Sequence, residues 1–339
     1  MENIFKDKNV LVTGAGGSIG SVVCEKLLQY NVKTIKCFDM SEYSLYKLQK
    51  NLRDDLRIRL LVGDVRDKDR LSRAICGSDL IVHAAALKHV TLCEYNVDEC
   101  YKTNVIGTQN IVDLANLHGV SHSLLVSTDK AANPSSVMGT TKLLAEKIFQ
   151  NESSHYWQTD SQKLKFTVVR FGNVFGSAGS VVETFYNQIK SGQRITLTDE
   201  DVSRYFISIE AASELILNCF NYSDGKQIFI LKMGQVKIID LAKKMFEILC
   251  ENNHEFDYDL VGLTPGEKIY ESLMTEREKL YCKDFKDYYI IDKEINFPHY
   301  KVKRTPGNIS YDNSIFINEK KLEEMILSWI QRYDNSVLC

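Results

Sequence analysis

Three glycines placed three residues apart constrain the fold of this chain more than any other feature. Gly14, Gly17 and Gly20 follow a short apolar run at residues 9–13, and in residues 18–30 apolar side chains recur at helical spacing. This order predicts a strand, a glycine turn and a helix. Glycine at these positions permits a tight turn, close approach of the backbone to an anion such as a pyrophosphate, and close packing of the helix on the strand. A glycine-rich loop without a ligand is the alternative, and the place of the pattern at the first helix argues against it.

Apolar runs and helical patterns continue to alternate along the first half of the chain. They predict strands at residues 34–38, 57–62, 80–83, 123–127 and 167–171, and helices at residues 42–53, 69–76, 97–118 and 137–154. Strands that are apolar on both faces and separated by helices are typical of the α/β class, with a doubly wound parallel sheet. After residue 175 the alternation loosens. We therefore expect a Rossmann-like domain over residues 1–175 and, over residues 176–339, a smaller substrate-binding lobe interleaved with the last strands of the sheet.

The charge and composition exclude several classes of partner. The 42 Lys and Arg residues nearly balance the 45 Asp and Glu residues, for a net charge of −3, and no basic run is interleaved with aromatic residues, so we expect no nucleic-acid partner. No apolar stretch approaches the roughly 18 residues that a membrane span needs, so we expect a cytoplasmic protein with no membrane partner. The nine Cys and seven His residues lack the spacing of a zinc site or a disulfide framework, so we expect no metal.

Two carboxylates follow the second and third predicted strands. Asp39 stands 19 residues after Gly20 and could accept hydrogen bonds from the ribose hydroxyls of an adenosine. Its charge would repel the 2′-phosphate of NADP, and residues 40–43 contain no Lys or Arg to offset that charge, so NAD is the expected cofactor. Helix capping is the alternative role for Asp39, but Ser41 is better placed to cap. Asp64 could bond the adenine amino group, or could be a plain turn residue.

The stretch from Ser127 to Lys142 contains the candidate acid and base. Asp129 and Lys130 follow the fifth predicted strand side by side, and general acid–base catalysis needs such a proton donor and acceptor. Met138 stands four residues before Lys142, so both lie on one face of the predicted helix. A thioether carries no exchangeable proton and cannot act as a base. The alternatives are a solvated surface pair for the acid and base, core packing for Met138 and an exposed helix position for Lys142.

Taken together, these residues resemble those of the extended short-chain dehydrogenase/reductase superfamily, and within it the nucleotide-sugar 4,6-dehydratases that act on N-acetylglucosamine. Seven short motifs carry the resemblance in order, at residues 13–20, 83–90, 103–108, 127–131, 137–142, 170–174 and 265–268. That family has a branch with Tyr and a branch with Met at the position of Met138, and this chain is similar to the Met branch. Thr91 departs from the family, in which Pro is usual. Several relatives in the Met branch carry an N-terminal membrane region that this sequence does not contain, so we expect a free-standing catalytic domain.

The resemblance implies a NAD-dependent 4,6-dehydratase that converts UDP- or GDP-linked N-acetylglucosamine to the 4-keto-6-deoxy sugar, with loss of water and retention of the C5 configuration. Such products serve bacterial-type surface glycans or sialic-acid-like sugars, and a homo-oligomer, dimeric or larger, is expected. Asp129 would be the acid for the C6 hydroxyl and Lys130 the base for C5. Thr128 would hydrogen-bond the sugar near C4, and Lys142 would hold the nicotinamide ribose. With Met138 unable to take the C4 hydroxyl proton, we assign it to Asp129, directly or through a water held by Thr128.

The resemblance also assigns the binding residues. Those expected to hold NAD are Gly14, Gly17, Ser18, Ile19, Gly20, Asp39, Asp64, Val65, Ala84, Ala86, Asn104 and Lys142. Those expected to meet the substrate are Lys88 and Asn173 at the sugar and diphosphate, Arg204 at the diphosphate, Arg194 and Thr196 near the nucleobase, and Glu267 in a Pro-Gly turn that closes over the substrate. Each charged member of this second set could instead be a surface residue.

Two other functions fit parts of the sequence. A nucleotide-sugar epimerase of the same fold needs no acid and base at C5 and C6 and would keep the Tyr, so the pair Asp129 and Lys130 together with Met138 argues against it. A non-catalytic NAD-sensing protein that has lost its Tyr is the second alternative, and the presence of the whole acid–base set argues against such decay. The sequence does not show whether the nucleotide of the substrate is UDP or GDP.

Overall fold

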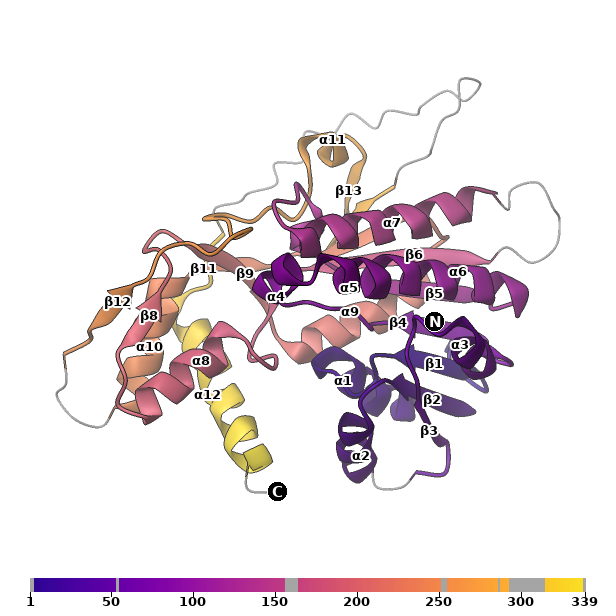
Figure 1. Ribbon diagram of the computed structural model, residues 1–339, viewed down its shortest axis with the longest axis horizontal. Coiled ribbons are helices and arrows are strands. Elements are labelled where there is room, and N and C mark those ends of the chain that lie inside the picture. The colour runs from indigo at the N-terminus through magenta and orange to yellow at the C-terminus, as the bar shows by residue number, and fades with distance from the viewer. Residues whose placement is uncertain are drawn as a thin grey trace.

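The computed structural model describes residues 3–52, 55–155, 164–250, 255–285, 287–292 and 315–337, and a nine-stranded sheet lies at its centre (Figure 1). Six strands run parallel in the order β3-β2-β1-β4-β5-β6: β1 Asn9–Thr13, β2 Thr34–Asp39, β3 Ile58–Val62, β4 Leu80–His83, β5 His122–Thr128 and β6 Lys165–Phe171. β10 (Ile228–Leu231) continues the parallel order, and β14 (Tyr288–Ile291) and β13 (Cys282–Phe285) close the edge in antiparallel pairing. The predicted α/β class with a doubly wound parallel sheet is confirmed.

Helices cover both faces of the sheet (Figure 1). The helices that pack on the side of β1 carrying Val10 and Val12 are α1 Ser18–Leu27, α2 Glu42–Asn51 and α9 Ile209–Tyr222. Those that pack on the side carrying Leu11 are α3 Lys68–Ile75, α6 Gly107–Leu117 and α7 Val137–His155. Successive residues of β1 therefore enter two separate apolar cores, which is why this strand is apolar throughout.

The segment between β4 and β5 differs from the single helix predicted over residues 97–118. The structure divides it into α5 (Val97–Tyr101), a five-residue π-helical turn (Lys102–Ile106) and α6. Within the π-helical turn, the Asn104 side chain accepts from the Leu87 N–H at 2.8 Å and donates to the Leu87 carbonyl at 3.0 Å. Upstream lies α4 (Val90–Tyr95), which was not predicted because six residues are too few to show helical periodicity.

Much of the chain after β6 forms a smaller lobe with its own apolar core. Its strands are β7 Asn173–Val174, β9 Ser203–Ile207 and β11 Gly234–Lys237 in one sheet, and β8 Ile195–Leu197 with β12 Tyr258–Leu260 in another. Its helices are α8 Val181–Lys190, α10 Ile238–Leu249 and α12 Glu319–Val337. The indole of Trp329 in α12 donates to the Gly176 carbonyl at 3.1 Å. Gly176 has a φ of +67°, and the Trp329 ring fills the space of its missing side chain, so glycine is required there.

Parts of the C-terminal half return to the large sheet. The helix α9, the strand β10 and the β13–β14 pair all pack there, and the short helix α11 (Glu276–Lys279) precedes β13. This arrangement is in keeping with the expected interleaving, while the boundary at residue 175 stays a prediction. In the parts of the chain that the structure describes, no helix is both long and apolar enough to cross a bilayer.

Candidate active site

The predicted glycine turn lies between β1 and α1 at the carboxyl edge of the parallel strands. A Cβ atom on Gly14, whose φ is +66°, would stand 2.7 Å from the Ala85 nitrogen, and one on Gly20 would collide with the Gly14 carbonyl oxygen. On Gly17 it would meet only that same oxygen, at 3.2 Å. Gly17 is also the N-cap of α1, and no side chain caps this helix end. The turn thus leaves backbone N–H groups at a helix N-terminus open to an anion, as a dinucleotide pyrophosphate requires.

Asp39 ends β2 beside this turn. Its Oδ2 accepts from the Gly16 N–H and its Oδ1 from the Ser41 N–H, each at 2.9 Å. Capping of α2 belongs to Ser41, whose hydroxyl accepts from the Ser44 N–H at 3.2 Å. The alternative role for Asp39 as a helix cap is therefore wrong, and its place next to the glycine turn fits a carboxylate that meets the adenosine ribose.

Two other residues predicted for the cofactor have partners within the protein. Asp64 forms an ion pair with Arg66 at 2.6 Å, and although burial raises the pKa of Asp64, the hydrogen bonds from Arg66 bring it below its ordinary value. Val65 is buried, and a Cβ on Gly107 would come within 2.7 Å of its Cγ2. These contacts describe a structural turn after β3, and a role for Asp64 at the adenine stays a prediction.

The loop after β4 is held from both sides. The Ala84 N–H donates to the Thr13 carbonyl at 3.1 Å, and Asn104 fixes Leu87 through its buried amide. Asn104 therefore stabilises the loop that contains Ala84 and Ala86. It would influence a bound cofactor through the conformation of that loop. His83, at the end of β4, has its pKa lowered to about 3 by burial and by the charge of Lys142, as expected for a structural histidine.

Residues predicted for the cofactor and for the substrate meet at the loop after β7. The Ala178 N–H donates to the Ser18 hydroxyl at 3.2 Å, and the Lys88 ammonium donates to the Ala178 carbonyl at 2.7 Å. Ile19 packs against the core beneath α1. The N-terminus of α1 and Lys88 therefore border one continuous region.

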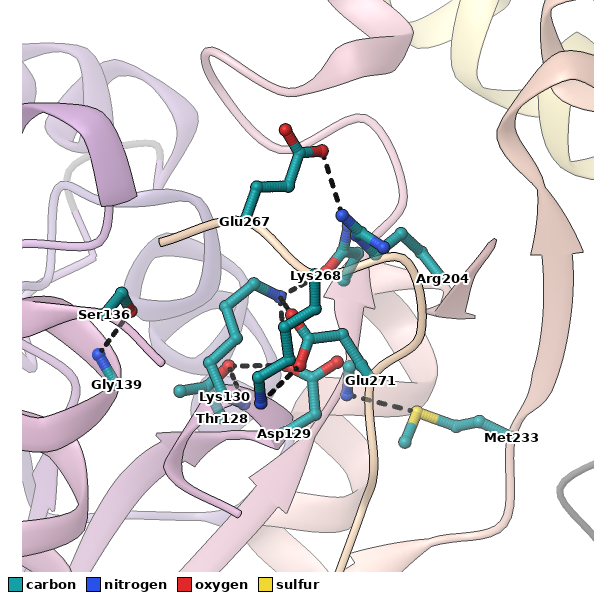
Figure 2. Close-up of polar contacts among 12 residues, drawn as sticks. Thr128, Asp129, Lys130, Ser136, Gly139, Arg204, Met233, Glu267, Lys268 and Glu271 are labelled. Atoms are coloured by element: carbon teal, nitrogen blue, oxygen red, sulfur yellow. Dashed lines mark hydrogen bonds and ion pairs between the residues drawn. The ribbon is translucent and has the colours of Figure 1, made fainter. Parts of the chain in front are cut away.

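The candidate acid and base lie together directly after β5 (Figure 2). The Thr128 hydroxyl donates to Asp129 Oδ1 at 2.9 Å, and the Lys130 ammonium donates to the same oxygen at 3.1 Å. Lys130 also donates to Asn173 Oδ1 at 3.0 Å, so a predicted substrate residue joins the cluster. Asp129 is fully buried, and within the described residues its Oδ2 has no hydrogen-bond partner. Because Asp129 is buried, the alternative of a solvated surface pair is wrong. A buried carboxylate oxygen without a partner is costly unless a ligand reaches it.

Lys142 and Met138 lie one turn apart on α7. The Lys142 ammonium donates to the Val126 carbonyl at 2.7 Å, and burial lowers the pKa of Lys142 to about 8. Met138 is 4% exposed and packs in a small cluster with Cys93 and Cys100. Lys142 is thus not the exposed helix residue of the alternative reading, whereas Met138 has the contacts of a packing residue.

A cleft of about 380 Å³ opens next to the acid–base cluster. Its walls include Lys130, Thr198, Arg204, Glu267 and Glu271. Arg204 donates to Glu267 Oε1 at 3.0 Å, and Figure 2 shows this pair above the cluster. These residues include two of the six predicted for the substrate, Arg204 and Glu267, and they come from β9 and the Pro-Gly turn.

The two residues predicted near the nucleobase lie apart from these walls. Arg194 is exposed and pairs with Asp257 at 2.8 Å and Asp259 at 3.1 Å. Thr196 in β8 accepts from the Gln188 amide at 2.9 Å. Neither lines the cleft. Their role at a nucleobase stays a prediction.

Glu271 is a site residue that sequence reasoning missed. Its side chain is 4% exposed, and its Oε1 lies 3.8 Å from the Lys130 nitrogen. Its Oε2 accepts from the Lys268 ammonium at 3.4 Å. The available signal was a carboxylate in the segment already predicted to close over the substrate, four residues after Glu267. Nothing in the sequence distinguishes it from an exposed Glu.

A buried charge network next to the site connects β6, α7 and α11. Arg170 in β6 lies 2.6 Å from Glu146 of α7 and 3.0 Å from Glu278 of α11, and all three side chains are at most 3% exposed. The Ser127 hydroxyl donates to Glu146 at 2.6 Å, directly before Thr128. Within the described residues, no group of three or more His, Cys, Asp or Glu side chains could hold a metal ion.

Comparison with known proteins identifies the family. The sequence matches the family described as polysaccharide biosynthesis protein over residues 10–293. The chain belongs to this family. It is 41% identical to an uncharacterized membrane protein of Methanocaldococcus jannaschii, over 96% of this chain and 97% of that one. It is 34% identical to a UDP-N-acetylglucosamine 4,6-dehydratase (inverting) of Campylobacter jejuni, over 95% and 98% of the two chains.

Solved structures and a further relative are also similar to this chain. Pen from Bacillus thuringiensis has a TM-score of 0.85 at 36% identity, covering 96% of this chain and 99% of that one. DesIV, a dTDP-glucose 4,6-dehydratase of Streptomyces venezuelae solved with NAD, shares the fold with a TM-score of 0.74 at 19% identity, over 96% and 97% of the two chains. A UDP-glucose 4-epimerase of Rickettsia rickettsii is 33% identical over 96% and 97% of the two chains. The predicted kinship with the nucleotide-sugar branch of the extended short-chain dehydrogenase/reductases is confirmed.

The relatives differ in length. The capsular polysaccharide biosynthesis protein CapD of Staphylococcus aureus is 38% identical over 84% of this chain, and that match covers 49% of CapD. The chain therefore spans about half the length of some of the curated relatives it matches.

Proposed function

We propose that this protein is a NAD-dependent 4,6-dehydratase acting on UDP- or GDP-linked N-acetylglucosamine. The acid–base cluster after β5 carries the proposal: buried Asp129 has one oxygen without a partner among the described residues, and Lys130 lies 3.1 Å from its other oxygen. Removal of water across C5 and C6 needs such an acid and base, whereas epimerisation at C4 does not. The cleft beside them is large enough for part of a nucleotide sugar.

The residues that would hold NAD are those of the glycine turn together with Asp39. Bound there, NAD would supply the acceptor for the two electrons removed at C4 and the donor that returns them at C6. The open helix end at Gly17 suits the pyrophosphate, and the carboxylate of Asp39 suits the ribose hydroxyls and disfavours a 2′-phosphate. Lys142, buried and one turn beyond Met138, would hold the nicotinamide ribose in exchange for its present bond to Val126.

The hydrogen bonds around Asp129 suggest a route for the C4 hydroxyl proton. Because the Thr128 hydroxyl donates to Asp129 at 2.9 Å, it can pass its own proton to Asp129 while it accepts the proton of the sugar hydroxyl. Asp129 then gives that proton to the departing C6 hydroxyl, which leaves as water. In this route the Thr128 hydroxyl itself relays the proton, in place of direct transfer to Asp129 or transfer through a water held by Thr128. After turnover Asp129 is ionised again, as at the start.

The C5 proton would move to Lys130 and back. A neutral Lys130 takes this proton as water leaves and returns it when C6 is reduced. One base on one face of the sugar restores the original configuration, so we propose retention at C5, in contrast to the inversion named for the Campylobacter jejuni relative. In deuterated water, deuterium should appear at C5 with the configuration retained. Inversion would require a second acid on the opposite face.

An epimerase is the second candidate, because the family includes proteins named as such. One experiment separates the two. Purified protein is incubated with UDP- and with GDP-N-acetylglucosamine, and the products are weighed by mass spectrometry. A 4,6-dehydratase gives a product lighter by one water, and the active substrate identifies the nucleotide. A product of unchanged mass and altered C4 configuration would replace the proposal with epimerisation, and recovery of unchanged substrate by a NAD-loaded protein would favour a non-catalytic role.

A further inference from the structure

Glu271 is a buried carboxylate to which the proposed chemistry gives no task. It belongs to the segment between the Pro-Gly turn and α11, and Figure 2 shows it between Lys130 and Lys268. Its Oε1 lies 3.8 Å from the Lys130 nitrogen and its Oε2 3.4 Å from the Lys268 nitrogen. The same side chain lines the cleft. A carboxylate with 4% exposure at this position has a large desolvation cost and two ammonium neighbours to offset it.

Lys130 cannot act as a base while it is an ammonium group. Its nitrogen donates hydrogen bonds to Asp129 Oδ1 and Asn173 Oδ1. An ammonium group has no lone pair and cannot accept the C5 proton. One proton must therefore leave Lys130 before the elimination.

The neighbours of Lys130 differ in their ability to take that proton. Asp129 must be ionised to receive the C4 hydroxyl proton, so it cannot also hold the proton that leaves Lys130. The amide of Asn173 is too weak a base, and Lys268 and Arg204 carry cations that only donate. Glu271 is the remaining group among the described residues that contact Lys130.

We propose that Glu271 is a positioning residue that accepts one proton from Lys130 and so leaves Lys130 neutral for its work at C5. This inference rests on the proposed dehydratase function. An N–H bond of Lys130 breaks and an O–H bond forms on Glu271 Oε1, with no other reactant. The 3.8 Å separation has to close to about 3 Å for this transfer, a movement that the flexible stem of Lys130 allows. After turnover Lys130 is neutral again and Glu271 keeps the proton.

The charges around Glu271 agree with a carboxyl group that binds a proton readily. Burial raises the pKa of Glu271, and the neighbouring charge of Asp129 raises it further. The cations Lys130, Lys268 and Arg204 act in the opposite direction, and the net shift is upward. Once Lys130 is neutral, one of these opposing cations is gone, which favours the protonated carboxyl group still more.

The proposal has a specific consequence for the pH profile. In the wild type, the resting pair of ammonium and carboxylate and the active pair of amine and carboxylic acid contain the same number of protons. Their ratio is therefore independent of pH. With Gln at position 271, Lys130 has to lose its proton to solvent, so the rate should rise about tenfold per pH unit until Lys130 is neutral. A merely structural defect would lower the rate at every pH by the same factor.

The test compares the wild type with Glu271→Gln, Glu271→Asp and Glu276→Gln. Glu276 is the first residue of α11, directly after this segment, and its exposed side chain contacts Lys279. The rate of water loss at saturating substrate is measured from about pH 6 to about pH 9, and circular dichroism and NAD content establish that each variant is folded. We expect the wild type and Glu276→Gln to have a flat profile in the acid part of this range, where transfer to Glu271 leaves Lys130 neutral. Glu271→Gln should have a rising profile that approaches the wild-type rate at the alkaline end, where Lys130 loses its proton to solvent in every variant. Glu271→Asp keeps a carboxyl group and should keep the flat shape at a lower rate.

Three outcomes would overturn the proposal. A profile for Glu271→Gln parallel to that of the wild type would show that Glu271 holds no proton for Lys130. If Glu271→Gln does not fold, Glu271→Asp decides, because a steep rise in that variant contradicts the role of the carboxyl group. Failure of the wild type to release water at any pH would refute the dehydratase function itself. That failure is distinguishable because it appears without any mutation.

Discussion

Arg170 Nη1 lies 3.0 Å from Glu278 Oε2, and this buried contact ties β6 to the segment that carries Glu271. Arg170 also donates to the Leu273 carbonyl at 2.9 Å, two residues beyond Glu271. On its other side it binds Glu146, which accepts from Ser127 just before the acid–base cluster. The same guanidinium group thus holds both walls of the site, the end of β5 and the segment from Glu267 to Glu278.

Removal of this tie should cost stability. Glu278→Ala leaves Arg170 buried with one carboxylate instead of two and removes the Glu278 contact with the Thr275 N–H in the capping box of α11. We expect a loss of about 3–5 kcal/mol in the free energy of unfolding, measured with urea. Glu276→Ala, on the same helix but exposed, is the control and should change stability by less than about 0.5 kcal/mol. Equal urea midpoints for the two variants would contradict a stabilising role for the contact between Arg170 and Glu278.

Asp129→Asn and Lys130→Met should each reduce water loss by about 10²- to 10⁴-fold, because each removes a proton carrier from the elimination. NAD content should be unchanged in both, since neither residue is part of the glycine turn. Asp113→Asn, a change of the same kind on α6 where Asp113 pairs with Lys68, serves as the control. Near wild-type rates in both variants would place the chemistry elsewhere.

The protein should purify with NAD bound, because the cofactor is reduced and reoxidised within one turnover and need not dissociate. Heat releases the nucleotide, and chromatography identifies it. Gly17→Ala should fold, since the added Cβ meets only the Gly14 oxygen at 3.2 Å, but it should lose most of the NAD because the methyl group stands at the open helix end. Recovery of NADP from the wild type would contradict the interpretation of Asp39.

Two buried histidines should make stability fall in mild acid. Burial lowers the pKa of His83 and of His122 to about 3, with the charges of Lys142 and Lys165 as the smaller causes. The unfolded chain binds a proton at each histidine near pH 6.5, while the folded chain stays neutral there. The free energy of unfolding should therefore be full above about pH 6.5 and decrease below it, by up to about 1.4 kcal/mol per pH unit for each histidine. His122→Asn should reduce that slope between about pH 6.5 and pH 5 in urea titrations, and an unchanged slope would contradict the prediction.

The strands of the sheet were well predicted because each has a local signal in the sequence. β1 and β4 have the expected bounds, since each is an apolar run that ends at a sharp change of composition. The π-helical turn at Asn104 was not predictable, because its side chain responds to Leu87, seventeen residues away. Glu271 was missed for a similar reason: its burial depends on Lys130 and Lys268, and a single Glu in a polar turn has no periodic signal. Asp129 and Lys130 could be found because they are adjacent in the chain and occur within a recognisable motif.

The last prediction concerns Met138, which has no proton to exchange at any pH. It is 4% exposed and packs with Cys93 and Cys100, so its contribution to the site is its volume and not its chemistry. Met138→Leu, which nearly keeps that volume, should retain most of the dehydratase activity and cost less than about 1.5 kcal/mol of stability. Met138→Ala should lose about 2–5 kcal/mol through the cavity it leaves, yet keep substantial activity at temperatures where it is folded. The two variants are compared by urea unfolding and by the rate of water loss under the same conditions. A collapse of the rate in the folded Leu variant, of the size expected for Asp129→Asn, would mean that the thioether itself takes part at C4, and the route through Thr128 would then have to be abandoned.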